Sequence, residues 1–419
     1  MAGEAVTLQL GHYAGCVGAH WWGLQARGCG QLRGAGNRDR GAGWRAAAGE
    51  GTAGNGRGKP SWFFLLSPDA APAPGSSTQL WSDYLSVQLH PRSIYVLQQY
   101  NHDGDSGRLE AFGQGEKLLQ DVGCIEELED RLHFYVEECD YLQGFQVLCD
   151  LHDGFSGVGA KVTELLHDEY SRKGILTWGL TPVTHNVGDP QKNFYRVLNT
   201  ALGIAHLSAH SSLFCPLSLS GSLGIKPQPP TAFPYLNYDA SLNYHSSAVL
   251  AAALDTLTVP YRLCSSRGSM MHLAEMLNFS GRKVVAAWAA VPFPAVRGHS
   301  LPDALCAHQQ DVPWKLLSSC GEQKVSRCFA QSVVLRGICK ENPTSASHVL
   351  EQPCVTLPPY PRIFSSLLSR QGFLPDNLSS YSAAGNVAPY NYFAIESNPV
   401  GQKGLTKVQD PFLSLQGRK

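Results

Sequence analysis

Residues 137–170 read EECDYLQGFQVLCDLHDGFSGVGAKVTELLHDEY, and this stretch decides the fold. The apolar run at 145–149 predicts a buried strand, and the glycines within 154–159 predict a tight turn directly after it. Apolar side chains at helical spacing follow the turn: Val162, Leu165, Leu166 and Tyr170. Residues 174–178, GILTW, predict the next strand. The order is therefore strand, glycine-rich turn, helix, strand.

The same order opens the chain. Residues 6–22, VTLQLGHYAGCVGAHWW, begin with alternating apolar positions and continue into glycines and paired tryptophans, which predicts strand, glycine loop and helix. Further helices are expected at 128–139, 193–210 and 246–257, the last ended by Pro260, and a further strand at 283–291. Alternating strands and helices of these lengths predict an α/β fold with a doubly wound, largely parallel sheet and helices on both faces.

Composition restricts the class of protein. The chain has 419 residues, of which 43% are hydrophobic and 16% charged, so it can bury a sizeable core. Its formal net charge of −1 supplies no long-range field for DNA or RNA, and nucleic acid is not an expected partner. We find neither a signal peptide nor an apolar run long enough for a membrane span. The twelve cysteines form no CxxC pair and are expected to be reduced, as in a cytoplasmic protein.

Composition also suggests how the chain is divided. Five segments are expected: a first strand, loop and helix start at 1–22; a disordered low-complexity linker at 23–76; a main domain at 77–265; a second α/β part at 266–362; and an irregular tail at 363–419. The linker is rich in Gly, Ala, Arg and Pro and is interrupted only by the apolar run at 62–66.

Two glycine-rich turns are candidate phosphate-binding loops, because phosphates bind where glycine-rich backbone meets a helix N-terminus. One spans residues 11–18 and the other residues 154–159. The candidate cofactor-binding positions are Gly11, Gly18, Gly154, Gly157 and Gly159. The alternative is that strand-to-helix turns need glycine for steric reasons alone, and the spacing favours this second interpretation.

No metal site is expected. His102, Asp103 and Asp105 could coordinate a cation, but an Asp/Gly-rich turn accounts for them without one. His206 and His210 have the spacing of two zinc ligands on one helix, but no third ligand lies near them in the sequence. The acidic helix at 126–140 is interpreted as a solvated face, with a contact surface for a basic partner as the alternative.

Several stretches resemble known proteins. VTLQLGHYAGCVGAHWW is similar to the first strand, nucleotide loop and helix start of tubulin, and LQGFQ at 142–146 with its glycine-rich turn is similar to tubulin's phosphate loop and flanking elements. Together with WSDYLSVQLHPRSIYVLQQYNHDG, LEAFGQGEKLL and VPYRLCSS, the chain is identified as resembling the Misato family, a divergent tubulin- and FtsZ-like group. The resemblance covers residues 1–22 and roughly 80–360.

The departures from tubulin concern its nucleotide chemistry. His152, Asp153 and Phe155 stand where tubulin's phosphate loop has glycine or threonine, and His12 and Tyr13 stand where tubulin places a glutamine and a small cysteine. Asp153 would repel a phosphate, and the two ring side chains at 12 and 13 would crowd a base. Residues 259–271 contain no counterpart of tubulin's acidic hydrolysis loop. We therefore expect no catalytic residues and no GTPase activity, with weak GTP binding at the surviving glycines as the open alternative.

The resemblance also implies a function. It implies a regulator of mitochondrial distribution, morphology and fusion, located in the cytoplasm and peripherally at the mitochondrial outer membrane, with protein partners at that surface or on the cytoskeleton. Two rival functions are a divergent GTP-binding switch and a tubulin-like module associated with the cytoskeleton or a chaperonin. Because segments 23–76 and 363–419 depart from the family pattern, the chain is expected to be an alternative form of a longer protein.

Overall fold

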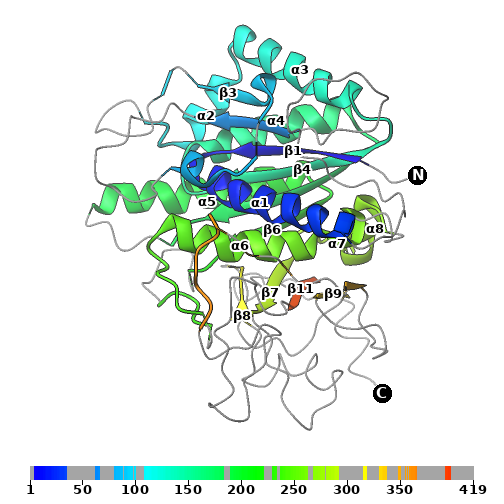
Figure 1. Ribbon diagram of the computed structural model, residues 1–419. Helices are drawn as coiled ribbons and strands as arrows, with labels where there is room; N and C mark the ends of the chain where they lie inside the picture. The colour runs from blue at the N-terminus through cyan, green and yellow to red at the C-terminus, as the bar shows by residue number, and fades with distance from the viewer. Residues whose placement is uncertain are drawn as a thin grey trace, which may run out of the picture.

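The structure is a computed structural model (Figure 1). It describes residues 4–34, 62–66, 80–87, 89–97, 99–100, 108–183, 189–220, 229–233, 236–262, 268–278, 280–291, 315–318, 330–336, 348–350, 354, 356, 358–365 and 392–397.

The main sheet has six strands in the order β3-β2-β1-β4-β5-β6, and every neighbouring pair is parallel. Its strands are β1 (Glu4–Leu10), β2 (Trp62–Leu66), β3 (Ile94–Val96), β4 (Leu142–Asp150), β5 (Gly174–Thr181) and β6 (Leu213–Ser218). The chain proceeds outward from β1 in one direction and from β4 in the other. The boundary between β1 and β4 is therefore the topological switch point, where doubly wound sheets bind their ligands.

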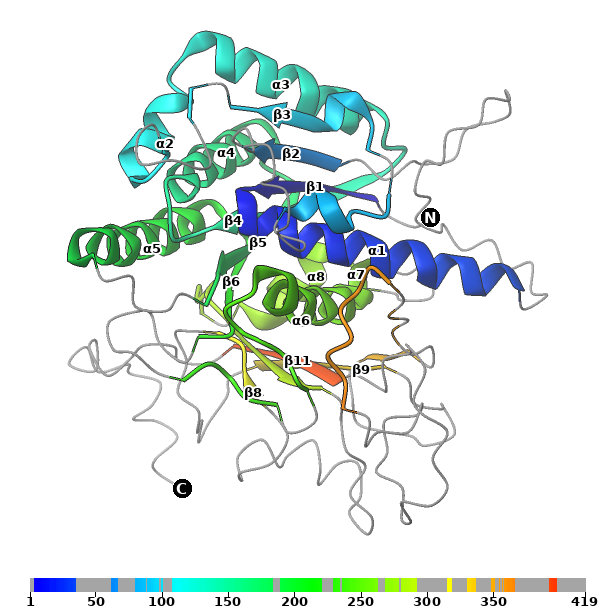
Figure 2. The ribbon, with the colours of Figure 1, turned by 60° about the vertical axis from the view of Figure 1, so that its left-hand side comes forward.

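Helices cover both faces of this sheet (Figure 2). One face packs against α1 (His12–Gly34) and α6 (Asn243–Leu257), and the other against α3 (Val122–Glu137), α4 (Phe155–Glu169) and α5 (Pro190–His210). Short helical segments complete the order: η1 (Trp81–Tyr84), η2 (Pro91–Ser93), α2 (Phe112–Leu118), α7 (Val259–Arg262) and α8 (Met270–Leu277). The predicted fold class is confirmed.

Strand periodicity explains the two cores. On β4, Phe145 and Val147 belong to the core under α3 and α4, whereas Leu148 belongs to the core under α1 and α6. Alternate residues of a strand face opposite sides of a sheet, so a strand covered on both faces is apolar at nearly every position. This burial on two sides is the reason that the strand at 145–149 is a continuous apolar run.

A second sheet of five strands lies beyond α6 and has the order β10-β9-β11-β7-β8. Its strands are β7 (Ala286–Ala290), β8 (Lys315–Leu316), β9 (Ala330–Arg336), β10 (His348–Leu350) and β11 (Tyr392–Ser397). Helix α6 contacts elements of both sheets, and its residues from Ser246 to Leu257 are all buried. A helix buried all round is apolar all round, as the Ala- and Leu-rich sequence of α6 is.

The expectation of a disordered linker at 23–76 is wrong at its start, and the apolar run at 62–66 that was expected to interrupt the linker is a strand. Helix α1 continues to Gly34, and β2 is an inner strand of the main sheet, parallel to β1 with Thr7 opposite Trp62. Trp21, Trp22 and Leu24 are buried and fix the helix against the core. Composition averaged over a long segment hides short elements whose stability comes from tertiary partners.

Two further expectations need correction. The tail at 363–419 is not wholly irregular, because β11 pairs antiparallel with both β7 and β9. Helix α6 ends at Leu257, as predicted, but Pro260 does not prevent a new helical turn, since it lies in the first turn of α7, where a missing N–H leaves no helical hydrogen bond unmade. In the described part of the chain, no helix has the length and apolar character needed to cross a bilayer.

Candidate functional site

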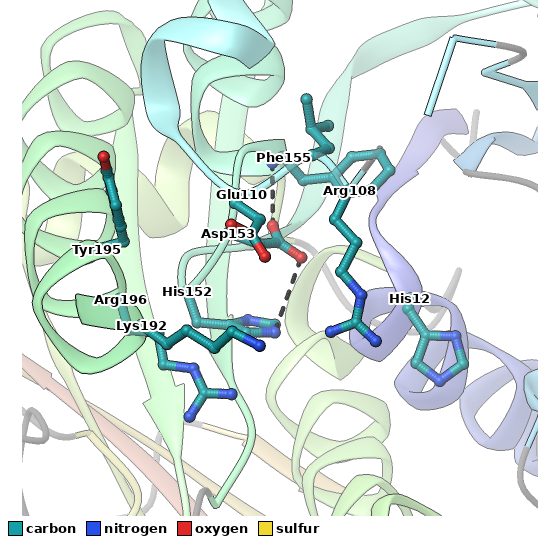
Figure 3. A pocket seen from close by; sticks show the side chains of 10 residues that line it. His12, Arg108, Glu110, His152, Asp153, Phe155, Lys192, Tyr195 and Arg196 are labelled. Atoms are coloured by element: carbon teal, nitrogen blue, oxygen red, sulfur yellow. Dashed lines mark hydrogen bonds and ion pairs between the residues drawn. The ribbon is translucent and has the colours of Figure 1, made fainter. Parts of the chain in front are cut away.

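A cavity of about 170 Å³ opens at the switch point, beside the carboxyl ends of β1 and β4 (Figure 3). It is lined by His12, Arg108, Leu109, Glu110, His152, Asp153, Phe155, Lys192, Tyr195 and Arg196. These residues come from the start of α1, the segment before α2, the turn between β4 and α4, and the first turns of α5. Both sequence-predicted glycine turns therefore meet at one place, as expected for a doubly wound sheet.

The first of these turns consists of a single residue. Gly11 has φ +114°, and helix α1 begins immediately after it. A Cβ at Gly11 would lie 2.3 Å from Oδ2 of Asp150, so glycine is required both by the backbone conformation and by space. The predicted loop at 11–18 is thus shorter than expected, and Gly18 lies inside the helix, where a Cβ would overlap the side chain of Gln9.

Asp150 caps the N-terminus of α1. Its Oδ2 accepts a hydrogen bond from the Tyr13 N–H and its Oδ1 accepts one from the Ala14 N–H, both at 2.8 Å. The side chain is completely buried, and the next amide, that of Gly15, donates to Gly11 O at 3.1 Å. A carboxylate of the chain itself therefore occupies the helix terminus where a phosphate oxygen would be expected to bind.

Helix α4 is closed in a similar way. The Gly154 N–H donates to Leu109 O at 3.0 Å, and the Phe155 N–H donates to Oδ1 of Asp153, also at 3.0 Å. The next two amides, of Ser156 and Gly157, donate to the backbone carbonyls of Asp153 and Gly154. All four amides of the turn thus have acceptors within the chain. Asp153 points at the amide of Phe155, so it shields the helix terminus from an incoming anion.

The glycines of the second turn have steric roles. A Cβ at Gly157 would lie 1.9 Å from the carbonyl oxygen of Phe112, and one at Gly154 would lie 2.6 Å from Leu109 Cγ. A Cβ at Gly159 would lie 2.4 Å from Sγ of Cys149. These contacts bring the chain around α2 and strand β4 directly against the first turns of α4. The glycines are therefore explained by close packing of backbone and side chains without any ligand.

The nucleotide of tubulin-like proteins does not fit this geometry. Its phosphates need free amides at the two helix termini, and the amides at 13–15 and 154–157 already have partners. The cavity is also smaller than the 300–1,000 Å³ typical of small-molecule sites. Burial and the neighbouring Asp153 raise the pKa of Asp150 well above its usual range, while the N–H groups of Tyr13 and Ala14 oppose this rise.

Two side chains that were expected to crowd a nucleotide lie in different places. His12 lines the cavity. Tyr13 instead points into the core between α1 and α6, where its hydroxyl donates to Ser246 Oγ at 3.1 Å and burial raises its pKa. Phe155 is buried and forms part of the cavity wall. Of these three rings, those of His12 and Phe155 line the cavity, and that of Tyr13 does not.

A metal is not favoured at this cavity either. Asp150, His152 and Asp153 bring one ligand atom each within 4.8 Å of one another. However, both oxygens of Asp150 and one of Asp153 accept backbone N–H groups, and three permanent cations line the same cavity. His206 and His210 belong to no group of three potential ligands among the described residues, and their rings lie near Phe112 and His167. His102, Asp103 and Asp105 lie outside the described residues.

Sequence reasoning missed several residues of the site, among them Asp150, Arg108, Lys192 and Arg196. Asp150 ends a buried strand, and an acidic residue at that position of a doubly wound fold was a usable signal for a side chain aimed at the switch point. Lys192 and Arg196 have i, i+4 spacing on the first turns of α5, which places both on one face. Arg108 gave no such signal, because only the tertiary fold brings it to the cavity.

Comparison with known proteins agrees with this architecture. Residues 70–263 match the family model described as a tubulin domain. The chain is 45% identical to protein misato homolog 1 of Mus musculus over 92% of the chain and 87% of that protein. It is 56% identical to the Homo sapiens homologue over 74% of the chain and 61% of that protein, and 35% identical to protein misato of Drosophila melanogaster over 62% and 46%.

Coverage differs between these relatives. The aligned region spans 64% of the Bos taurus homologue's length and 63% of the Macaca fascicularis homologue's length, but 87% of the mouse protein. The mouse alignment joins high identity to near-complete coverage of both chains, and the resemblance noted in the sequence is confirmed. The chain belongs to the Misato family, with a tubulin-like fold.

Proposed function

We propose that this chain is a non-enzymatic regulator of mitochondrial distribution, morphology and fusion that acts through contacts with other proteins. Its site of action would be the cytoplasm and the outer mitochondrial surface, with peripheral association at the membrane. Membership of the Misato family supports the mitochondrial role. The tubulin-like fold then serves as a scaffold and not as a GTPase.

One observation carries the non-enzymatic part of this proposal. The two helix termini that would hold a nucleotide's phosphates are capped by Asp150 and Asp153 of the chain itself. To bind a phosphate at the start of α1, the protein would have to displace the buried carboxyl group of Asp150 from two N–H groups, or hold the phosphate beside amides that already have acceptors. Either step costs free energy that phosphate binding to a glycine loop with free amides does not cost.

Thermal unfolding with and without millimolar GTP, GDP and Mg²⁺ tests this part. A ligand present at about a hundred times its Kd stabilises the folded state by about 2.7 kcal/mol, which moves the melting temperature measurably. We expect no shift beyond that produced by the same concentration of sodium triphosphate. A GTP-specific upward shift would favour the rival function, a divergent GTP-binding switch. Tubulin, measured in parallel, provides the positive control.

Add-back to cells that lack the endogenous protein tests the mitochondrial part. We expect the wild-type chain to restore the length and distribution of mitochondria, and Asp255→Ala, which breaks a buried ion cluster, to fail because it unfolds. Arg172→Gln alters only an exposed side chain and provides the matched control. Co-purification with a chaperonin, together with no effect of the wild-type chain on mitochondria, would instead support the third function, a chaperonin-associated module.

A further inference from the structure

The cavity at the switch point is lined mainly by cationic side chains. Arg108, Lys192 and Arg196 carry permanent positive charges, and His12 and His152 add two imidazoles. The acidic lining residues are Glu110 and Asp153, so the permanent charges leave an excess of one positive charge when the histidines are neutral. Figure 3 shows the charged ends of Arg108 and Lys192 directed into the cavity. This local excess contrasts with the net charge of −1 of the whole chain.

Two of these cations form no ion pair with any residue that the structure describes. Oδ2 of Asp153 lies 3.7 Å from Nε2 of His152, and Oδ1 accepts the Phe155 N–H, so both oxygens of this carboxylate already have a neighbour within the chain. Among the described residues, neither Lys192 nor Arg196 forms an ion pair, and Nη1 of Arg196 is buried without a hydrogen-bond partner. Burial lowers the pKa of Arg196, Asp153 opposes this effect, and Arg108 adds to it. An anion placed between these side chains would relieve both the missing hydrogen bond and the repulsion.

Size and charge restrict that anion. The cavity of about 170 Å³ is smaller than the roughly 300–1,000 Å³ of typical small-molecule sites, which suits one carboxylate group and not a nucleotide. A single negative charge would balance the excess positive charge, whereas a dianionic phosphate would meet stronger repulsion from Glu110 and Asp153. The guanidinium groups of Arg108 and Arg196 also present the fork of donors that binds carboxylates in a bidentate manner.

The rim of the cavity suits a protein ligand. Arg108, Glu110 and Lys192 are exposed at its mouth, and Tyr195 in its wall has its ring 6.3 Å from the ring of Phe194, which is 64% exposed. Exposed aromatic rings beside arginine are typical of the residues that dominate binding at protein interfaces. A partner segment lying across the mouth would cover these rings while one of its acidic side chains enters the cavity.

We propose that this cavity binds a carboxylate side chain from an acidic segment of a partner protein. The inference deepens the proposed function by giving the chemical class of the partner's contact. It assigns Arg196 and Lys192 as the principal binding residues and Arg108 as a residue of the mouth. It requires no change in the capped termini of α1 and α4.

The test uses a fluorescently labelled hexaglutamate peptide and the full chain, with binding followed by fluorescence anisotropy. We expect Arg196→Gln to weaken binding by roughly tenfold or more, because it removes a charge-assisted contact. The matched control is Arg172→Gln, which removes the same charge from an exposed position just before β5, at the amino end of that strand, whereas the cavity lies at the carboxyl ends of the strands. Its affinity should stay within roughly twofold of the wild type, because a distant exposed charge is screened by solvent and salt.

Several results would overturn the inference. Equal weakening by Arg196→Gln and Arg172→Gln would show non-specific attraction, and absence of peptide binding would show that the cavity takes no carboxylate. Competition separates the anion classes. If inorganic phosphate displaces the peptide at a far lower concentration than acetate does, the ligand of this cavity is a phosphate and not a carboxylate. If the chain binds neither GTP nor the peptide, only this inference fails. A GTP-specific melting shift would contradict the proposed function whether or not the peptide binds.

Discussion

The carboxylate of Asp150 accepts the backbone N–H of Tyr13 at 2.8 Å, although the two residues are 137 positions apart in the sequence. This hydrogen bond crosses the switch point from the end of β4 to the first turn of α1. It gives the helix N-terminus a hydrogen-bond acceptor from within the chain, which is the part that a bound phosphate plays in nucleotide-binding proteins of this architecture. The structure thus supplies its own acceptor at the place where the fold provides an anion site.

Removing this acceptor should destabilise the protein. Asp150→Ala leaves the Tyr13 and Ala14 amides buried without partners, and we expect the free energy of unfolding to fall by about 2 kcal/mol. Urea denaturation followed by circular dichroism measures the change. Asp153→Ala is the companion variant, and it should lose less because Asp153 is only partly buried and caps a single amide. Unchanged stability of Asp150→Ala would contradict the capping role.

The pH dependence of stability should distinguish two buried aspartates. Burial and Asp153 raise the pKa of Asp150, so the folded chain retains a proton that the unfolded chain releases above about pH 4. The contribution of Asp150 to stability therefore decreases as the pH rises from that value through its folded pKa. We expect the difference in unfolding free energy between the wild type and Asp150→Asn to shrink as the pH rises above about pH 4.

Asp255 should behave in the opposite way. Burial alone would raise its pKa, but Arg336 and Arg262 outweigh burial and lower it. Its contribution is present above the unfolded pKa of about 3.9 and is lost as the pH falls through the lower folded value. The difference between the wild type and Asp255→Asn should therefore shrink on acidification below about pH 4. The same slope for both aspartate variants would show that one of the two environments is described wrongly.

The ion cluster around Asp255 joins helices α6 and α7 to the second sheet. Asp255 on α6 pairs with Arg262 on α7 at 2.8 Å and with Arg336 at the end of β9, and all three side chains are buried. Asp255→Ala would leave two guanidinium groups without their carboxylate, at a cost of about 3–5 kcal/mol. Glu127→Ala breaks the exposed pair with Arg131 on α3 and should cost less than about 1 kcal/mol. If Asp255→Ala and Glu127→Ala lower the denaturant midpoint equally, burial does not determine the cost of breaking these two ion pairs.

Two glycines offer a paired test of packing against ligand binding. Gly157→Ala places a Cβ against the Phe112 carbonyl, and we expect it to cost about 1–3 kcal/mol with or without nucleotide. Gly113 lies one residue from Phe112 on α2 and has open space around its Cα, so Gly113→Ala should be neutral or stabilise by up to about 1 kcal/mol. Thermal melts of the two variants make the comparison. A stable Gly157→Ala would show that packing does not require this glycine.

Local patterns predicted most of the main sheet and its helices. The strands at 145–149 and 174–178 lie within β4 and β5, and the helices at 193–210 and 246–257 lie within α5 and α6. Periodicity succeeds here because each element is long and buried on a defined face. It failed for β2 and β11, which are short strands whose neighbours along the chain carry no pattern and whose hydrogen-bond partners are distant in sequence.

The candidate site likewise has some features that the sequence predicted and others that depend on the tertiary structure. The sequence placed Gly11 and Gly154 at strand-to-helix turns, because glycine tolerates the positive φ of Gly11 and the crowding at both positions, and the parallel arrangement required the two turns to meet. The tertiary structure alone decided what fills the space between them. Asp150 reaches the amides of α1, and Arg108, Lys192 and Arg196 surround the remaining cavity. Hydrogen bonds and charges between distant segments depend on how the layers pack, whereas turn and strand preferences are local properties of the chain.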